Sequence, residues 1–567
     1  MPTFPATSPA AGPFALPRLR VDRWGVATMI IAFFVAVPLL AVAALALSPT
    51  ENIWRHLADT VLWSYVRKTL ILMAGIGLGT FIIGTGTAWL VTMCRFPGRA
   101  VLNWALLLPL AVPTYILAFV FTDQLEYSGA IQSALRDIFG WRNRQDYWFP
   151  EIRSIGGAIT VMTLVLYPYV YLLARAAFLE QSVCVLEVSR TLGKTPWQSF
   201  WGVALPLARP AVAVGMTLAM MEALNDFGTV DFFGVATFTA GIYDVWLNMD
   251  NIGGAAQLAS VLMVFVLILI VLERMARRGQ RYHHTTTKMQ ALPSQRLTGL
   301  RAGLACAACA LPVLLGFVLP AGVLMTYALR FYEKTLAAKY WAITFNSIAL
   351  SATAAAAAVV IGLLLAYGLR LGRGPLPRAA VRLASIGYAV PGAVLAIGVI
   401  VPMAAFDNAV DDIAETVFGV STGLVLSGTV VAILYGYLAR FLALSFGTVE
   451  AGLCKVSHNI DGAARTLGAG PSKIMGRIHF PLIRTSLLTA GLLVFVDCMK
   501  ELPMTIILRP FGFDTLATFV YQFASDELFE ESALGALTIV AAGLIPVILL
   551  AVTTLRSRPG HASGGAV

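Results

Sequence analysis

Four acidic residues stand inside otherwise apolar segments of the sequence, where they could bind a solute. Glu222 and Asp226 are four residues apart, and Asp497 and Glu501 repeat this spacing. Each pair would therefore lie on one face of a helix. If the segments cross a membrane, each exposed charge would cost roughly 2.5–3.5 kcal/mol at the bilayer centre. We therefore expect these acids to face a watery cavity or one another.

The chemistry of such a cluster favours a hard cation. Carboxylate oxygens bind hard cations such as Fe³⁺ better than thiolates or thioethers do. An ion in transit must also leave, so we predict transient contacts along a pathway and no tightly bound metal. We include Lys500, which lies beside Glu501, among the pathway residues. The alternative is structural: Lys500 pairs with Asp497 or Glu501 and bridges two parts of the protein.

The composition supports a membrane environment for these acids. The chain has 567 residues, of which 58% are apolar and 12% charged, and its mean hydropathy is +0.79. A soluble protein usually carries about 25% charged residues. Too few charges remain to cover soluble domains, which excludes a soluble enzyme, a disordered chain and a disulfide-stapled secreted domain. The sequence predicts an all-α polytopic membrane protein.

Twelve segments are long and apolar enough to span a bilayer, since a span needs about 20 mostly apolar residues. The predicted spans are 24–47, 66–91, 101–122, 155–178, 205–227, 255–273, 300–327, 343–369, 380–402, 422–445, 482–502 and 533–555. With the N-terminus inside, 28 of the 40 Lys and Arg fall in inner loops and tails, including a loop over 440–484. Basic residues are retained on the cytoplasmic side, so both termini are predicted to be cytoplasmic.

The two halves of the chain resemble each other at a fixed separation. Pro391 repeats Pro113 at a separation of 278, and the sequence Arg-Thr-Leu-Gly at 190–193 recurs at 465–468, at a separation of 275. We predict two six-helix repeats that enter the membrane from the same side and are therefore parallel. The predicted divisions are a disordered cytoplasmic tail (1–23), a first repeat (24–273), a basic cytoplasmic linker (274–300), a second repeat (301–556) and a C-terminal tail (557–567).

The loop between the fourth and fifth helix of each half carries an apolar pattern although it is cytoplasmic. These loops span 187–206 and 461–481, and glycine and proline divide each into short amphipathic helices. An apolar face that lies outside lipid needs a protein partner. The alternative is a pair of helices that lie on the bilayer surface.

These loops resemble the EAA loop of binding-protein-dependent ABC importer permeases, in which an acid and small residues precede a glycine and a later Leu-Pro. The resemblance implies an all-α permease whose loops dock onto a separate ATPase and transmit its closure. Two departures are visible: Val188-Ser189 replace the usual alanines, and Gly462 occupies the acid position with Asp461 one residue early. The implied ATPase-coupling residues are Glu187, Arg190, Gly193, Pro206, Asp461, Arg465, Gly468 and Pro481.

Three further blocks, at 221–229, 500–505 and 513–518, resemble the fused two-repeat permeases of ferric-iron importers. The resemblance implies an inner-membrane permease that receives iron from an external solute-binding protein. Permeases for thiamine and phosphonates are similar, so these cargoes stay open. An ion-coupled secondary transporter with twelve helices is a further alternative, because its halves are also parallel repeats.

The sequence offers no nucleotide site or catalytic motif of its own. Gly193-Lys194-Thr195 ends like a phosphate-binding loop but lacks the glycine five residues earlier. We therefore predict no catalytic residue and no cofactor on this chain, with ATP and Mg²⁺ bound by the partner. The predicted partners are two ATPase copies, the solute-binding protein and the lipid bilayer, and no nucleic acid.

Overall fold

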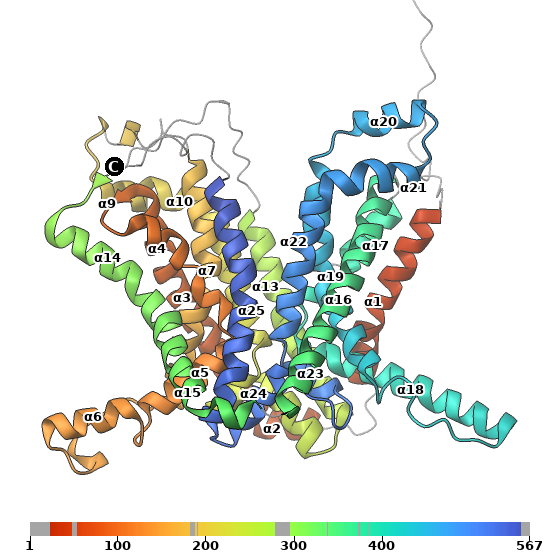
Figure 1. The fold of residues 1–567 in the computed structure, drawn as a ribbon, viewed down its shortest axis with the longest axis horizontal. Helices are drawn as coiled ribbons and strands as arrows, with labels where there is room; N and C mark the ends of the chain where they lie inside the picture. Colours follow the sequence, from red (N-terminus) through yellow and green to blue (C-terminus); the bar gives the residue numbers. More distant parts are fainter. Residues whose placement is uncertain are drawn as a thin grey trace, which may run out of the picture.

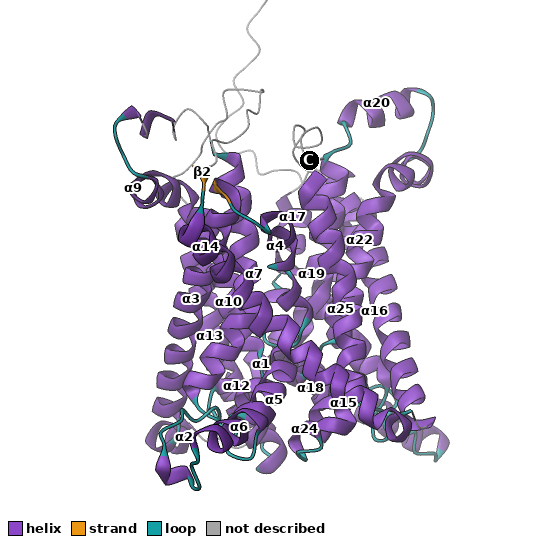
Figure 2. Cartoon of the chain, turned by 60° about the vertical axis from the view of Figure 1, so that its left-hand side comes forward, coloured by secondary structure: helices purple, strands orange, loops and turns teal. Residues whose placement is uncertain are grey.

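The computed structural model describes residues 23–47, 54–181, 187–189, 191–277, 295–336, 338–371, 375–384 and 386–556. Most of the predicted tails and linker, and Arg190 of the first loop, lie outside the described residues. Within the described part, helices account for almost the whole chain (Figures 1 and 2).

The first half runs from α1 to α13. Its elements are α1 (Arg23–Leu47), α2 (Trp54–Thr60), α3 (Leu62–Met93), β1 (Cys94–Arg95), α4 (Arg99–Ala105), η1 (Leu108–Ala111), α5 (Thr114–Leu125), α6 (Ala130–Phe139), η2 (Arg144–Asp146), α7 (Ile155–Glu180), α9 (Pro196–Ser199), η3 (Phe200–Ala204), α10 (Leu205–Asn225), α11 (Gly228–Phe232), α12 (Phe238–Tyr243), η4 (Asp244–Asn248) and α13 (Ile252–Arg277).

The second half repeats this order. Its elements are β2 (Gln295–Arg296), α14 (Gly299–Val313), η5 (Leu314–Val318), α15 (Leu319–Thr335), α16 (Ala338–Leu371), α17 (Pro375–Ala384), η6 (Gly387–Ala389), α18 (Gly392–Phe418), α19 (Val430–Cys454), α20 (His458–Thr466), α21 (Pro471–Ile474), η7 (Met475–His479), α22 (Phe480–Met499), α23 (Pro503–Leu508), α24 (Leu516–Ser525) and α25 (Phe529–Arg556). Strand β2, inside the predicted linker, pairs in parallel with β1.

The predicted fold class is confirmed. Among the described residues, eleven helices are long and apolar enough to span a membrane, or twelve if one bent pair counts as a span. The helix order supports the duplication, since α3, α7, α10 and α13 correspond to α16, α19, α22 and α25 at offsets of about 275–278 residues.

The third span of each half differs from the prediction. Instead of one helix over 101–122, the chain bends by 93° between Arg99–Ala111 and Thr114–Phe139. Instead of a span over 380–402, helix α18 starts at Gly392 and continues through the predicted outer loop to Phe418. Both breaks fall at the repeated prolines, Pro113 and Pro391, which immediately precede α5 and α18. Proline disfavours helix at the residue before it, and this explains the break.

The fifth span of each half begins earlier than predicted. The helices that were expected to start at 205 and 482 run continuously from Pro196 and Pro471, where proline is well tolerated as a first helical residue. Pro206 and Pro481 follow wider π-helical turns, η3 and η7. The coupling segments are thus direct extensions of α10 and α22, so a displacement of either segment would be carried into the membrane.

The first long helix of each half packs against the other half. In Figure 1, α1 lies beside α16 to α18, and α14 and α15 lie beside α3 to α5. The contact between α1 and α18 is close: a Cβ on Gly398 would lie 2.1 Å from the carbonyl oxygen of Pro38. On the other side of the bundle, where η5 of the second half meets α7 of the first, a Cβ on Gly316 would lie 2.7 Å from the carbonyl oxygen of Leu164. The two halves therefore interlock.

The bundle has two distinct ends. The short helices α9 and α20 lie at one end, together with the first turns of α10 and α22, while α6 and the end of α18 project from the opposite end (Figure 1). Both predicted coupling loops therefore lie at the same end, as parallel repeats require.

Candidate translocation site and coupling loops

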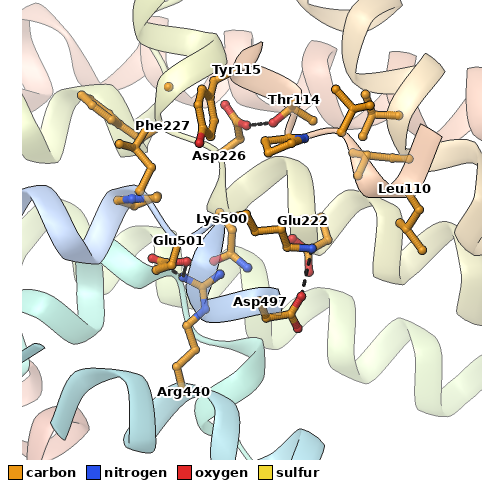
Figure 3. A pocket seen from close by; sticks show the side chains of 18 of the residues that line it. Leu110, Thr114, Tyr115, Glu222, Asp226, Phe227, Arg440, Asp497, Lys500 and Glu501 are labelled. Atoms are coloured by element: carbon orange, nitrogen blue, oxygen red, sulfur yellow. Dashed lines mark hydrogen bonds and ion pairs between the residues drawn. The ribbon is translucent and has the colours of Figure 1, made fainter. Parts of the chain in front are cut away.

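A cavity of about 100 Å³ lies between the two halves and collects the predicted pathway residues (Figure 3). Its wall includes all five of them, contributed by the C-terminal ends of α10 and α22 and the turns that follow: Glu222, Asp226, Asp497, Lys500 and Glu501. Aromatic side chains and Arg440 complete the wall. The structure thus places the five residues around one space, although they come from segments about 275 positions apart.

Each helix carrying the acids is broken at the cavity. Helix α10 ends at Asn225 and α11 begins at Gly228, while α22 ends at Met499 and α23 begins at Pro503. The Asp226 carboxylate accepts a hydrogen bond from the Thr229 amide (2.7 Å), and Glu501 accepts one from the Met504 amide (3.1 Å). The second acid of each pair therefore caps a short helix, where carboxylates favourably meet free amides.

The two capping acids, Asp226 and Glu501, have different side-chain partners. Asp226 also accepts a hydrogen bond from the Thr114 hydroxyl. Glu501 instead receives Nη1 of Arg440, 2.9 Å from both carboxylate oxygens. Gly392 stands where the repeat has Thr114, and a Cβ there would lie 2.4 Å from Nη1 of Arg440. A small residue therefore leaves the space that the buried ion pair occupies.

The first acids of the two pairs, Glu222 and Asp497, also line the cavity but differ in their partners. Nζ of Lys500 lies 2.9 Å from Asp497, as the dashed line in Figure 3 shows. Glu222 accepts a hydrogen bond from the Tyr388 hydroxyl at 3.3 Å. Among the described residues, Glu222 makes no ion pair within 4.0 Å, so it is the carboxylate most available to a passing solute.

Arg440 was missed by the sequence analysis. It was counted with the cations of the predicted inner loop 440–484, although it also lies within the predicted span 422–445. The structure places it in the middle of α19, 5% exposed, with Nε lacking a hydrogen-bond partner among the described residues. Its position inside the apolar segment 430–442 was the available signal.

The first coupling loop presents an apolar face. Glu187 and Val188 are exposed, and Leu192 has an exposed fraction of 73%. Gly193 has a φ of 78°, in the left-handed region that glycine adopts without strain. Trp89 of α3 packs against Phe200 at the base of the loop, with ring centroids 5.0 Å apart. An aromatic contact therefore joins this loop to the membrane helices.

The second coupling loop has the same outline but a polar attachment. Leu467 is 87% exposed, and Gly468 has a φ of 78°, as Gly193 does. Asp461 was expected to face a partner, but it is only 7% exposed and points inward. Leu192 and Leu467 are 275 residues apart, so the exposed apolar side chain recurs at the repeat spacing.

Asp461 lies in a buried polar cluster that ties α20 to two membrane helices. Arg370 at the end of α16 donates from Nε to Asp461 (2.8 Å) and from Nη1 to the Leu453 carbonyl (2.7 Å). Nε2 of His479 lies 2.7 Å from the other Asp461 oxygen. Burial alone would raise the pKa of Asp461, but the hydrogen bonds and charges of Arg370 and His479 outweigh it and hold this pKa below its usual value.

The remaining predicted coupling residues stay at the surface. Arg465, Pro206 and Pro481 are exposed. The arrangement as a whole offers two exposed apolar loops at one end and a charged cavity between the halves. It is suited to passing a movement of the loops to the cavity along α10 and α22.

Comparison with known proteins defines the class. Residues 80–282 match the family described as "Binding-protein-dependent transport system inner membrane component". The chain is a permease subunit of an ABC importer and a multi-pass inner-membrane protein. Permeases of this family work with an ATPase and a solute-binding protein.

Several relatives resemble the chain over both halves. "Fe(3+)-transport system permease protein FbpB 2" of Haemophilus influenzae is 27% identical over 493 residues, covering 85% of this chain and 88% of the relative. "Ferric transport system permease protein FbpB" of Actinobacillus pleuropneumoniae is 23% identical, covering 89% and 75%. "Molybdenum transport system permease protein ModB" of Escherichia coli is 28% identical over 232 residues, covering 39% of this chain and 93% of the relative. A complete one-repeat permease thus corresponds in length to less than half of this chain, as expected for two fused repeats.

Proposed function

We propose that this permease moves ferric iron delivered by an external solute-binding protein, and that two ATPase copies drive it by docking on the two coupling loops. The relatives that extend over both halves are named as ferric permeases. The observation that supports ferric iron as the cargo is the cavity between the halves, which is lined by four carboxylates and two cationic side chains. A route for a hard cation requires such oxygen ligands.

The pairing of charges in the cavity supports a cation over an anion. Lys500 is paired with Asp497, and Arg440 with Glu501. Asp226 accepts hydrogen bonds from hydroxyl and amide donors and, among the described residues, lies outside any ion pair. With Glu222 also outside an ion pair, the cavity carries an excess of negative charge when all four acids are ionised.

We propose that Glu222 makes the transient contact with the ion. Three other polar atoms of wall residues have no hydrogen-bond partner within the described residues: the hydroxyl oxygen of Tyr115, Oδ1 of Asn225 and Nε of Arg440. Buried polar atoms normally find a partner, which is often water. These atoms are therefore suited to holding waters around a passing ion.

We propose the following placement in the membrane. The end bearing α9 and α20 faces the cytoplasm, with both chain termini, because the coupling loops must reach the ATPases. The two domains are the repeats 24–273 and 301–556, and the ATPases bind ATP and Mg²⁺ while this chain binds no cofactor. Closure of the ATPases would move α9 and α21 and, through the continuous helices, the cavity walls.

Vesicle uptake tests the proposal. Membranes containing the permease, its ATPase and the binding protein should take up radioactive ferric iron with ATP and be insensitive to a protonophore. A Glu222→Gln variant should assemble normally but transport several-fold more slowly. Glu450→Gln, in the inner part of α19 and outside the cavity, serves as the matched control. Normal iron transport by Glu222→Gln would refute the pathway role.

An oxyanion is the second candidate cargo. One-repeat relatives are named as molybdenum and sulfate permeases, and Arg440 and Lys500 provide cations in the wall. Uptake assays in which the same vesicles are given molybdate or sulfate in place of ferric iron separate the two cargo classes. Uptake of an oxyanion without iron would refute the ferric assignment while leaving the coupling mechanism intact. Thiamine and phosphonates are tested in the same way, and uptake that follows an ion gradient without ATP would indicate a secondary transporter.

A further inference from the structure

Two arms project sideways from the end of the bundle opposite the coupling loops. We define the first arm as residues 126–154, containing α6, and the second arm as residues 403–429, containing the end of α18. Figure 1 shows α6 and α18 reaching to opposite sides of the bundle. The arms follow corresponding helices of the two repeats, α5 and the first part of α18.

The first arm has an apolar stripe along α6. Ile131, Leu135 and Ile138 recur at the spacing of one helix face, and Ile138 is 73% exposed. The opposite side of the helix is polar and packs on its own loop: Gln132 accepts a hydrogen bond from the Tyr147 hydroxyl at 2.6 Å. The stripe therefore stays uncovered while the polar side is satisfied.

The rest of the first arm is rich in aromatic and arginine side chains. Trp141 stacks on Phe139 and Tyr147, with ring centroids 4.7 and 4.6 Å apart. The Arg136 guanidinium lies 4.2 Å from the centre of the Tyr127 ring. Tryptophan and tyrosine are enriched at membrane–water interfaces, and interfacial helices combine an apolar face with basic residues.

The second arm also has an apolar stripe, but its polar side is acidic and residues 403–429 contain no Lys or Arg. Phe406, Ile413 and Val417 form a stripe along one side of α18 and are 52%, 62% and 64% exposed. Asp407 and Asp411 lie on another side and bind the returning chain. Asp407 is 1% exposed and accepts the amides of Leu426 and Ser427, and Asp411 accepts the amide of Thr422. These bonds hold the loop against the helix and away from the stripe.

We propose that the two arms lie in the membrane–water interface and hold the bundle at a fixed depth, with their apolar stripes in the outer lipid leaflet. Three observations support lipid as the occupant. The arms point away from the bundle, into the space that lipid fills around a polytopic protein. The spans themselves expose apolar side chains in the same way, such as Leu78 and Ile82 of α3, each 59% exposed. Each arm also satisfies its polar groups on a side other than the stripe.

Spin-label accessibility in nanodiscs tests this proposal on the full chain. A ketone-bearing amino acid at Ile138 or Ile413, coupled to a nitroxide, leaves the native cysteines in place. Labels there should be accessible to oxygen, which concentrates in lipid, and shielded from a water-soluble nickel complex. Asp137 and Glu415 are exposed neighbours off the two stripes and provide the matched controls, which should show the opposite preference.

Each outcome decides the question. Nickel accessibility at Ile138 and Ile413 equal to that of the controls would place the arms in water and overturn the proposal. Shielding from both reagents would mean that protein covers the stripes, as a second copy or the binding protein would, and would also overturn it. Oxygen preference at both stripes is the result that supports it. This result does not depend on the cargo.

Discussion

The buried cluster at Asp461 yields the sharpest prediction. Asp461 accepts side-chain hydrogen bonds from Arg370 and His479 and is 7% exposed. Replacing it by alanine would leave the Arg370 guanidinium buried, with carbonyl groups as its remaining acceptors among the described residues. Breaking a buried ion pair from one side costs about 3–5 kcal/mol. We expect Asp461→Ala to loosen α20 from the membrane helices.

The loss can be converted into a measurable ratio. A cost of about 3 kcal/mol lowers the equilibrium between attached and detached loop by roughly 100-fold. Hydrogen exchange of 458–466 should therefore accelerate by up to that factor, and ATPase affinity for the permease should fall. His458→Gln is the control, because His458 is 81% exposed and lies 4.0 Å from Asp461. Replacing the pair together, Asp461→Leu with Arg370→Met, should restore much of the attachment because no buried charge remains.

The pH dependence follows from the lowered pKa of Asp461. A carboxyl whose pKa is lower in the folded state stabilises the fold above its ordinary pKa of about 3.9 and loses that contribution as the pH falls through the folded value. The part of the difference in exchange between the wild type and Asp461→Ala that comes from the Asp461 carboxylate should therefore shrink as the pH falls below about 4. Wild-type exchange rates in the Asp461→Ala variant at neutral pH would refute the reasoning.

Three other variants test neighbouring features. Glu501→Gln should destabilise the assembled permease, since it leaves the buried Arg440 charge without its carboxylate; thermal unfolding in detergent measures this, and an unchanged midpoint would contradict it. Gly468→Ala should cost about 1–2 kcal/mol of local stability, because the left-handed φ of Gly468 disfavours a Cβ. Gly476→Ala is the control and should cost less, because φ is negative there and the space around a Cβ is open. Leu467→Asp should reduce ATPase copurification without changing membrane insertion, and full copurification would exclude this side chain from the docking surface.

Much of the fold is predictable because lipid imposes simple rules. A span must be long, apolar and helical, so α1, α3, α7 and α13 are visible as apolar segments. The repeat is visible because Pro113 and Pro391 recur at a fixed separation. The third span of each half was predicted wrongly because hydropathy counts the apolar residues on both sides of a break. It does not show that the chain changes direction at the break.

The site was predictable in part. Glu222 and its partners were found because a charge in an apolar segment is conspicuous. Their division of roles was not predictable: Asp226 and Glu501 cap helices, and this depends on breaks that α10 and α22 make at the cavity. Arg440 was overlooked because its depth depends on where α19 begins and ends. The burial of Asp461, named only as an implied coupling residue, was not predictable because its partners, Arg370 and His479, are 91 and 18 residues away.

The sequence by itself determined the membrane environment, the two repeats and the residues that carry charge or form the loops, because these follow from local composition and from spacing along the chain. The tertiary structure alone decided that α1 and α14 pack on the opposite halves and that Asp461 is buried. It also decided that Arg440 forms an ion pair with Glu501, whereas Thr114 donates a hydrogen bond to Asp226. These are contacts between distant segments, fixed by which surfaces fit together at close range, as at Gly398 and Gly392, where the absence of a Cβ permits the approach.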